Sequence, residues 1–589
     1  MRSNRFLAVL LSVALAAPQP LLAQAANRIL PGASSPAASG ISSSSSSYGS
    51  SSSAPIGLPL ESGPLDQYAA PDLPPDIAQG IFGTYGGAQS RFSGNAGGNA
   101  SLRAPVSTQQ LPDLGDGSGG TLTPQAERKL GERVMREVRR DPDYIGDWLV
   151  RDYLNSVSAK LAAAASAQYI GGYRPDFDLF AMRDPQINAF SLPGGFIGVN
   201  TGLIVATQTE SELASVIGHE MGHVLQRHIA RMISASEKSG YAALAGALFG
   251  VLAGVLAHSG DLGTAIALGG QAYAVDNQLR FSRSAEHEAD RVGFQLMSGA
   301  GYDPYGMVAF FERLDRAAMS DAGAPAYART HPLTGERIAD MSDRARRSPY
   351  RQPHQASEYG FVRARARVLQ DRSRSEYADE ITRMRSEIED KTALNVAANW
   401  YGIAYAQMLL DRYDDAAASL ATARQAFDAN ARREGDATRG SPSLDVLAAD
   451  IARRAGHDDD ALRLAQIAQT RWPQSHAAIE MHLRTLLTAR RYKDAQAQAQ
   501  RETEAEPQQP AWWLYLAQAS AGSGDALTQH RALAEQFALE GAWPSAIRQL
   551  KEARDIKTAG YYDLSTIDAR LHEFEARYKE ERQEEKDNS

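Results

Sequence analysis

Two histidines four residues apart, in the segment His219-Glu220-Met221-Gly222-His223, restrict this chain more than any other feature. Side chains at positions i and i+4 of a helix lie on the same face, so a helical segment lets both imidazoles bind one metal ion. A helix start precedes the motif, because Thr209 can cap a first turn and Glu212 completes a capping-box pattern. The sequence therefore predicts a helix that carries His219 and His223 as zinc ligands.

Glu220 lies next to the first of these histidines and is predicted to be the catalytic base. A carboxylate beside a metal-activated water can take its proton, which produces a nucleophile for attack on a peptide carbonyl. The spacing therefore indicates a metalloprotease with one Zn²⁺ per chain.

A catalytic zinc ion needs a third protein ligand as well as an open position. Glu286 and Asp290 are four residues apart in a second helical pattern, so we predict that Glu286 binds the metal while Asp290 orients a ligand histidine. Glu288, between them, is expected to point elsewhere. The alternative for these acidic residues is a solvated helix face.

The other histidines have no such requirement, and His228, His258 and His287 are interpreted as ordinary polar residues. His331, which precedes a proline, leaves three alternatives open. It can stabilise the oxyanion of the tetrahedral intermediate. It can instead occupy the open zinc position and hold the enzyme inactive until substrate displaces it, or it can be only a loop residue.

A small mixed sheet is predicted before the motif helix. Residues 174–182 have an extended pattern, and residues 186–199 read as two short strands around a Pro-Gly-Gly turn. We expect the second of these strands to line the cleft and to pair through its edge with an extended substrate. Its residues are Gly195, Phe196, Ile197, Gly198 and Val199.

The N-terminal residues 1–26 have the pattern of a signal peptide, with Arg2 and Arg5 before an apolar run and small residues after it. The run of about 12 apolar residues is shorter than the roughly 20 that span a bilayer. The chain has 0 cysteines, so no lipid-anchoring cysteine and no disulfide is available. We therefore expect an exported, soluble protein.

Two further segments have unusual compositions. Residues 27–110 are rich in Ser, Gly, Pro and Ala, and are predicted to be a disordered leader because they offer little apolar surface to bury. Residues 241–257 carry no charge but are short and rich in Gly for a membrane span. We expect this second segment to pack over the active site.

The C-terminal part is predicted to be entirely helical, with a linker at residues 351–390 and tetratricopeptide-like repeats at residues 391–589. Trp400, Tyr401 and Gly402 resemble the start of such a repeat, and Ala461 and Ala495 are separated by its 34-residue period. Neighbouring intervals are longer, so the repeats are degenerate, and an ordinary helical bundle is the alternative. A solenoid of this type would bind partners in a concave groove.

Four motifs together resemble a known family, the zinc metallopeptidases of HtpX and the CAAX prenyl proteases. They are HEMGH at 219–223, FSRSAEHEAD at 281–290, INAFSLPGGFIGVNTG at 187–202 and THPLTGERI at 330–338. The resemblance implies zinc ligands His219, His223 and Glu286 with catalytic Glu220, and it favours a position for His331 near the metal. The expected fold is mainly α: a gluzincin-like α+β metalloprotease domain with a small sheet at residues 111–350, followed by the tetratricopeptide-type solenoid.

Within this family, the signal peptide and the repeats imply a periplasmic quality-control protease of a Gram-negative bacterium. Its expected substrates are unfolded or misassembled outer-membrane β-barrel proteins, and the repeats are expected to contact the β-barrel assembly machinery. One alternative is a chaperone or scaffold in which zinc is mainly structural. Another, a membrane-embedded protease, requires residues 241–257 to insert. Nucleic acid is excluded as a partner because the net charge is −9 and no basic cluster is present.

Overall fold

A computed structural model describes residues 122–167, 175–235, 282–319, 325–349, 355–435 and 439–587. The predicted signal peptide (1–26), the predicted leader (27–110), the apolar segment 241–257 and His258 lie outside these ranges. The described part of the chain is mostly helical and contains one small sheet, as predicted.

The sheet has four strands, β1 (Tyr144–Ile145), β2 (Asp178–Met182), β3 (Ala189–Ser191) and β4 (Phe196–Asn200), in the order β1-β2-β4-β3. Strands β2 and β4 are parallel, and the other two pairs are antiparallel. The two strands expected around the Pro-Gly-Gly turn are therefore confirmed as β3 and β4. The turn between them, η1 (Pro193–Gly195), requires glycine because Gly194 and Gly195 have φ values of 78° and 95°.

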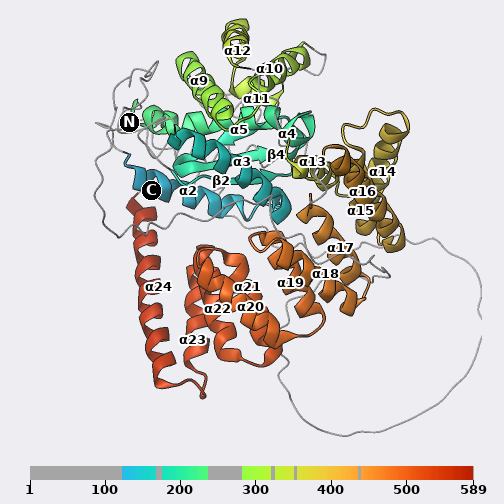
Figure 1. Cartoon of the computed structure of the whole chain (residues 1–589). Coiled ribbons are helices and arrows are strands. Elements are labelled where there is room, and N and C mark those ends of the chain that lie inside the picture. The colour runs from blue at the N-terminus through green and yellow to red at the C-terminus, as the bar shows by residue number, and fades with distance from the viewer. Residues whose placement is uncertain are drawn as a thin grey trace, which may run out of the picture. The chain divides into compact units, whose positions relative to one another are not determined.

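The helix with the histidine motif, α5 (Glu210–Leu225), lies between the sheet and two later helices (Figure 1). Thr209 caps α5 by accepting a hydrogen bond from the Glu212 backbone N–H at 3.2 Å. The Glu212 carboxylate accepts at 2.8 Å from the N–H of Gln208, one residue before the cap. The predicted helix start is thus confirmed, with the reciprocal contact shifted by one residue from a standard capping box.

The other helices around this core are separated by short connections in the described ranges. They are α2 (Pro124–Val138), α3 (Trp148–Ala167), α4 (Thr201–Ala206), α6 (His228–Ala235), α9 (Arg283–Gly299), α10 (Tyr305–Ala318), α11 (Ala326–Thr330) and α12 (Gly335–Arg347). Apolar side chains of α3, α5, α9, α10, β2 and β4 form one continuous core. This core fixes the position of α5 relative to α9. The candidate site lies on these two helices.

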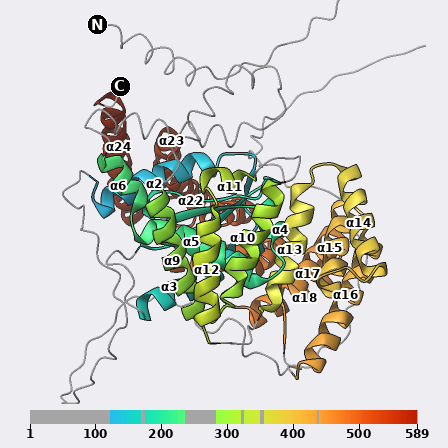
Figure 2. The ribbon, with the colours of Figure 1, turned by 90° about the horizontal axis from the view of Figure 1, so that it is seen from above.

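Twelve helices follow within residues 357–587: α13 (Ser357–Gln370), α14 (Arg374–Glu389), α15 (Val396–Leu409), α16 (Tyr413–Arg433), α17 (Pro442–Arg454), α18 (Asp458–Arg471), α19 (His476–Thr488), α20 (Tyr492–Ala505), α21 (Pro510–Ser523), α22 (Ala526–Leu539), α23 (Trp543–Arg554) and α24 (Tyr561–Asp587). Most helices pack against the next one along the chain (Figure 2). Helix α13, in the segment predicted as a linker, contributes Tyr359, Val362 and Ala366 to the first core.

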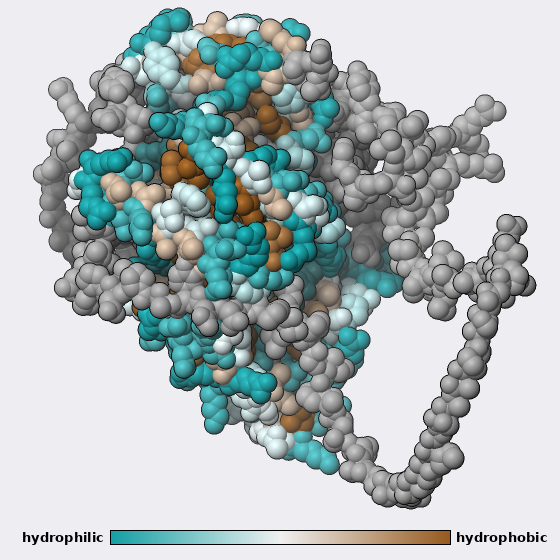
Figure 3. All heavy atoms as spheres, turned by 90° about the vertical axis from the view of Figure 1, so that its right-hand side faces the viewer, coloured by the Kyte–Doolittle hydropathy of each residue, from teal (hydrophilic) through white to brown (hydrophobic). Residues whose placement is uncertain are grey.

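The surface seen in Figure 3 is mostly hydrophilic, with hydrophobic side chains in small patches. Among the residues that the structure describes, no helix combines the length and the apolar character needed to cross a bilayer. The apolar segment 241–257, on which the membrane-embedded alternative depends, was not among those residues.

An aromatic stack joins α3 to the later helices. The His476 ring at the start of α19 stacks on Trp148 of α3 with 4.6 Å between centroids, and Trp148 stacks on Trp512 of α21 at 5.6 Å. His476 Nδ1 lies 2.6 Å from an Asp152 oxygen, and its Nε2 lies 3.0 Å from a Glu506 oxygen. Burial alone would lower the pKa of His476, but these two carboxylates outweigh it and raise the pKa to about 10.

This raised pKa predicts a pH-dependent contribution of His476 to stability. The contribution is complete below the unfolded-state pKa of about 6.5 and is lost as the pH rises toward 10, since the unfolded chain releases the proton first. We expect wild type to exceed His476→Gln in unfolding free energy by about 2–4 kcal/mol more at pH 6 than at pH 10. Denaturant titrations at both pH values measure this, and an equal difference at both would contradict it.

Candidate metal centre

Helix α5 buries three of the predicted site residues. His219, Glu220 and His223 are at most 1% exposed. The Nε2 atoms of the two histidines are 3.0 Å apart, so the i and i+4 spacing places both imidazoles together as expected.

Helix α9 approaches α5 closely because both helices present very small residues where they meet. A Cβ atom at Gly293 of α9 would lie 2.8 Å from the backbone nitrogen of His219, and one at Gly222 of α5 would lie 2.9 Å from the carbonyl oxygen of Ala289. Neither position has room for a side chain. The missing side chains therefore allow the acidic segment of α9 to reach the histidines of α5.

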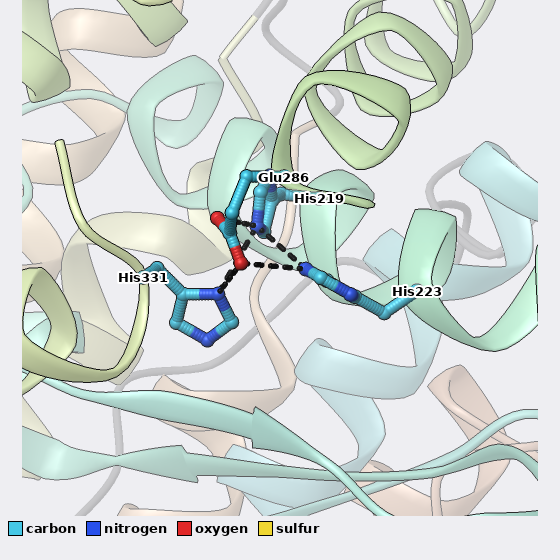
Figure 4. Close-up of side chains that lie close together, drawn as sticks. All are labelled: His219, His223, Glu286 and His331. Atoms are coloured by element: carbon cyan, nitrogen blue, oxygen red, sulfur yellow. Dashed lines mark hydrogen bonds and ion pairs between the residues drawn. The ribbon is translucent and has the colours of Figure 1, made fainter. Parts of the chain in front are cut away.

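Glu286 of α9 completes a triangle with the two histidines (Figure 4). Its carboxylate oxygens lie 3.5 Å from His219 Nε2 and 3.6 Å from His223 Nε2. Ligand atoms about 2.0–2.1 Å from a tetrahedral zinc ion are about 3.3 Å from one another. The two histidine nitrogens are 3.0 Å apart, His219 Nε2 is 3.5 Å from Glu286 Oε2, and His223 Nε2 is 3.6 Å from Glu286 Oε1. These separations are of the size that one zinc ion requires, and the nitrogen and oxygen donor types suit zinc.

His331, which follows α11, lies at the same cluster (Figure 4). Its Nδ1 atom is 3.0 Å from Glu286 Oε1 and 3.4 Å from His219 Nε2. One donor atom from each of the four residues falls within 4.8 Å of all the others. The His331 ring stacks on Tyr327 with 4.7 Å between centroids, which holds it in this position.

Glu220 faces the cluster without binding within it. Neither oxygen of this buried carboxylate makes a hydrogen bond in the described part of the chain, and an imidazole nitrogen of His331 lies 3.5 Å away. Burial raises the pKa of Glu220 above its usual value, although His331 and His219 act in the opposite direction. A buried carboxylate with a raised pKa is suited to accept a proton from water.

Asp290 and Arg337 support the first histidine. Asp290 Oδ1 lies 2.9 Å from His219 Nδ1, and Arg337 donates to both oxygens of Asp290 at 2.6 and 2.8 Å. A third guanidinium nitrogen is 2.9 Å from Glu286 Oε2. Burial acts to raise the pKa of Asp290, but the hydrogen bonds from Arg337 and His219 lower it below its usual value. The pair thus fixes the orientation of His219 through an ionised carboxylate.

Comparison with known proteins decides the family. Residues 150–345 match Peptidase family M48. Metalloprotease LoiP of Escherichia coli (strain K12) is 30% identical over 254 residues, which cover 42% of this chain and 89% of LoiP. The chain belongs to peptidase family M48. It is therefore a zinc metalloendopeptidase, and its buried cluster of His219, His223, Glu286 and His331 can hold the metal.

Other relatives match different lengths of the chain. The beta-barrel assembly-enhancing protease of Escherichia coli (strain K12) is 28% identical over 469 residues, covering 80% of this chain and 92% of the relative. The putative beta-barrel assembly-enhancing protease of Vibrio cholerae is 34% identical over 256 residues, which cover 44% of this chain and 51% of the relative, about half its length. Mitochondrial metalloendopeptidase OMA1 of Schizosaccharomyces pombe is 35% identical over 223 residues, which cover 37% of this chain and 60% of the relative.

The expectation that an extended substrate pairs with the edge of the second strand is wrong. The strand predicted from Gly195 to Val199 corresponds to β4, which begins at Phe196 because Gly195 belongs to the η1 turn. It does not offer a free edge, since β4 pairs with β2 on one side and with β3 on the other. The edge strand is β3 instead. Every residue of β4 is buried, and the strand lies inside the sheet between β2 and β3.

Three residues around the M48 site were not identified from the sequence. Arg337 lies in the THPLTGERI motif, but its bidentate contact with Asp290 depends on how α12 packs. His228, expected to be an ordinary polar residue, is buried against His223, and Glu288 contacts His228. A histidine five residues after HExxH was the available signal. His287, by contrast, is partly exposed and lies 4.0 Å from Glu336, outside the cluster.

Proposed function

We propose that this protein is a periplasmic zinc endopeptidase that degrades unfolded or misassembled outer-membrane β-barrel proteins and thereby assists their assembly. His219, His223 and Glu286 are the proposed zinc ligands, Glu220 the base and Asp290 the residue that orients His219. The observation that carries the catalytic part is the three-donor triangle with an adjacent buried, unbonded carboxylate. The substrate class rests on the relatives named beta-barrel assembly-enhancing protease, one of which covers 80% of this chain.

In the proposed mechanism, Glu220 accepts the proton of the attacking water and later delivers it to the leaving amine. A bound zinc ion would polarise the scissile carbonyl and make the water more acidic. The buried position of Glu220 keeps competing solvent away from the proton. Asp290 keeps the Nδ1 proton of His219 in place, so that Nε2 remains available as a ligand.

For substrate binding, we propose the outer edge of β3 in place of β4. Asn188 and Leu192 form backbone hydrogen bonds with β4 residues, at 3.0 and 2.7 Å. Backbone groups alternate in direction along an antiparallel strand, so those of Ala189 and Ser191 point away from β4. Ser191 is partly exposed, so its backbone groups are suited to pair with an extended polypeptide, which would explain a preference for unfolded chains, whereas Ala189 is buried.

For His331, we propose the gating role. Its Nδ1 atom takes the fourth corner of the donor set, at 3.4 Å from His219 Nε2. This is the position that substrate or the attacking water must use, so His331 has to move before catalysis.

Replacing His331 by alanine separates the two catalytic alternatives by the sign of the effect. If His331 blocks the site in nine of ten molecules, His331→Ala raises kcat/KM for an unfolded substrate about tenfold. A residue that stabilised the oxyanion would instead lower it by about 10²–10³-fold when removed. Peptide hydrolysis by the purified variants measures this, and a decrease would contradict the gating role.

We propose that residues 391–589 form a degenerate tetratricopeptide-like solenoid that binds substrates or the β-barrel assembly machinery. Four alanines that recur in the sequence each occupy the fourth position of a helix and are 0% exposed: Ala416, Ala461, Ala495 and Ala546. A residue with positive φ stands five positions before each of them: Asp411, Gly456, Arg490 and Gly541. At four places, therefore, a residue with positive φ is followed five positions later by a fully buried alanine in the first turn of a helix. This recurrence supports a repeated helix–turn–helix unit.

The substrate proposal is tested by hydrolysis of a β-barrel polypeptide in two states. The purified full chain should cleave the urea-unfolded polypeptide at least about tenfold faster than the same protein folded in detergent, because a folded barrel has no free strand to pair with β3. A zinc chelator should abolish cleavage, and added zinc should restore it. Equal cleavage of both states, or chelator-resistant cleavage, would argue against the proposal.

A further inference from the structure

A second series of hydrogen-bonded side chains reaches the candidate metal centre through His223, whereas Asp290 reaches it through His219. His228 begins α6 and is 4% exposed, and its Nδ1 atom lies 2.9 Å from Nδ1 of His223. The other ring nitrogen of His228, Nε2, lies 3.2 Å from Glu288 Oε2. The same Glu288 oxygen accepts from Arg231 at 2.9 Å.

The proton positions along this series follow from the role of His223. A ring nitrogen that binds a metal carries no proton, so a ligating Nε2 leaves the proton of His223 on Nδ1. His223 Nδ1 then donates to His228 Nδ1, which must be unprotonated. The proton of a neutral His228 therefore lies on Nε2 and is donated to Glu288, whose carboxylate only accepts. One set of tautomers thus satisfies every hydrogen bond from His223 through His228 to Glu288.

The backbone between the two histidines is held in an unfavourable conformation. Arg227, immediately before His228, has a φ of 51°, in the left-handed region that favours glycine. Its guanidinium donates to Glu127 at 3.2 Å and to the carbonyl of Leu122 at 2.8 Å. These contacts compensate a tight turn after α5 that brings His228 back to His223, so the approach is enforced by surrounding structure rather than by chance packing.

We propose that His228 and Glu288 are positioning residues for the zinc ligand His223, in the way that Asp290 positions His219. The inference rests on the proposed ligand role of His223. Helix α9 would then contribute three acidic residues to the metal site. Glu286 would be a ligand, Asp290 would orient His219, and Glu288 would orient His223 through His228. Because Glu288 acts through the His228 imidazole, it can support His223 without contacting that residue itself.

The proposal is tested by the zinc affinity of the full-length protein, measured by competition with a chromogenic chelator. His228→Phe keeps the size of the ring but removes the acceptor for His223, so the zinc dissociation constant should rise about 10–100-fold. His228→Asn can place its amide oxygen near the position of Nδ1, and it should recover most of this loss, to within about fivefold of wild type. Glu288→Ala should weaken zinc binding to an intermediate extent.

Two controls separate positioning from packing and from failure of the metal site itself. Glu336→Ala removes a carboxylate whose side chain is 83% exposed, and it should leave the zinc dissociation constant unchanged. If His228→Phe lowers the melting temperature of the metal-free protein but binds zinc within twofold of wild type, the role is packing and the proposal is overturned. If His223→Ala binds zinc as tightly as wild type, the proposed ligand set is wrong, and the positioning role fails with it.

Discussion

Replacing Glu220 by glutamine is expected to lower peptide hydrolysis by about 10³-fold, within the 10²–10⁴-fold range typical of general-base catalysis. Glutamine has nearly the same shape, but its amide cannot accept the proton of the attacking water. The polar neighbours of Glu220 are His331 and Ser191, and the amide oxygen of glutamine can still face both. Zinc content and the melting temperature should therefore stay close to wild type while activity is lost. Single-turnover hydrolysis of an unfolded substrate, with metal analysis of the same samples, measures both quantities.

A surface substitution of the same kind is the matched control. The Glu312 side chain on α10 is 53% exposed, so Glu312→Gln should retain full activity. Undiminished hydrolysis by Glu220→Gln would contradict the assignment of the base. Full complementation of a deletion strain by Glu220→Gln would support the alternative in which the protein acts mainly as a chaperone or scaffold, with structural zinc.

The part of the site that could be predicted from sequence lies within single elements. The helix from Thr209 and the position of His219 and His223 on one face follow from capping and from the 3.6-residue period. The strands on either side of the Pro193–Gly195 turn follow from glycines at positions that need positive φ. These are local relations, so they do not depend on how elements pack.

Relations between elements were harder to predict. Glu286, Glu288 and Asp290 are all acidic residues of one segment, and spacing alone separated the first and last from Glu288. The contact of Glu288 with His228 depends on the turn at Arg227, where a positive φ in an arginine has no sequence signature. The edge position of β3 likewise depends on strand order, which the pattern of apolar residues does not encode.

Arg337→Met is expected to destabilise the metal-free protein by about 3–5 kcal/mol, because removing one partner of a buried ion pair leaves the other charge uncompensated. Arg337 is 2% exposed and contacts two buried carboxylates, Asp290 at 2.6 and 2.8 Å and Glu286 at 2.9 Å. Methionine fills similar space without a charge. The unfolding free energy from denaturant titration in the presence of a chelator measures the loss. Saturating zinc should recover part of it, since a bound cation would compensate Glu286.

A double substitution distinguishes loss of charge compensation from loss of packing. Adding Asp290→Asn to Arg337→Met removes one of the two stranded charges, so the double variant should be more stable than Arg337→Met alone. Arg347→Met is the control on the same helix, because that arginine is 81% exposed and its removal should cost less than about 0.5 kcal/mol. If the double variant were less stable than Arg337→Met by the full cost of Asp290→Asn, the two residues would be energetically independent. The guanidinium would then contribute through packing on Phe311, whose ring centroid lies 5.3 Å away, and not through the buried carboxylates.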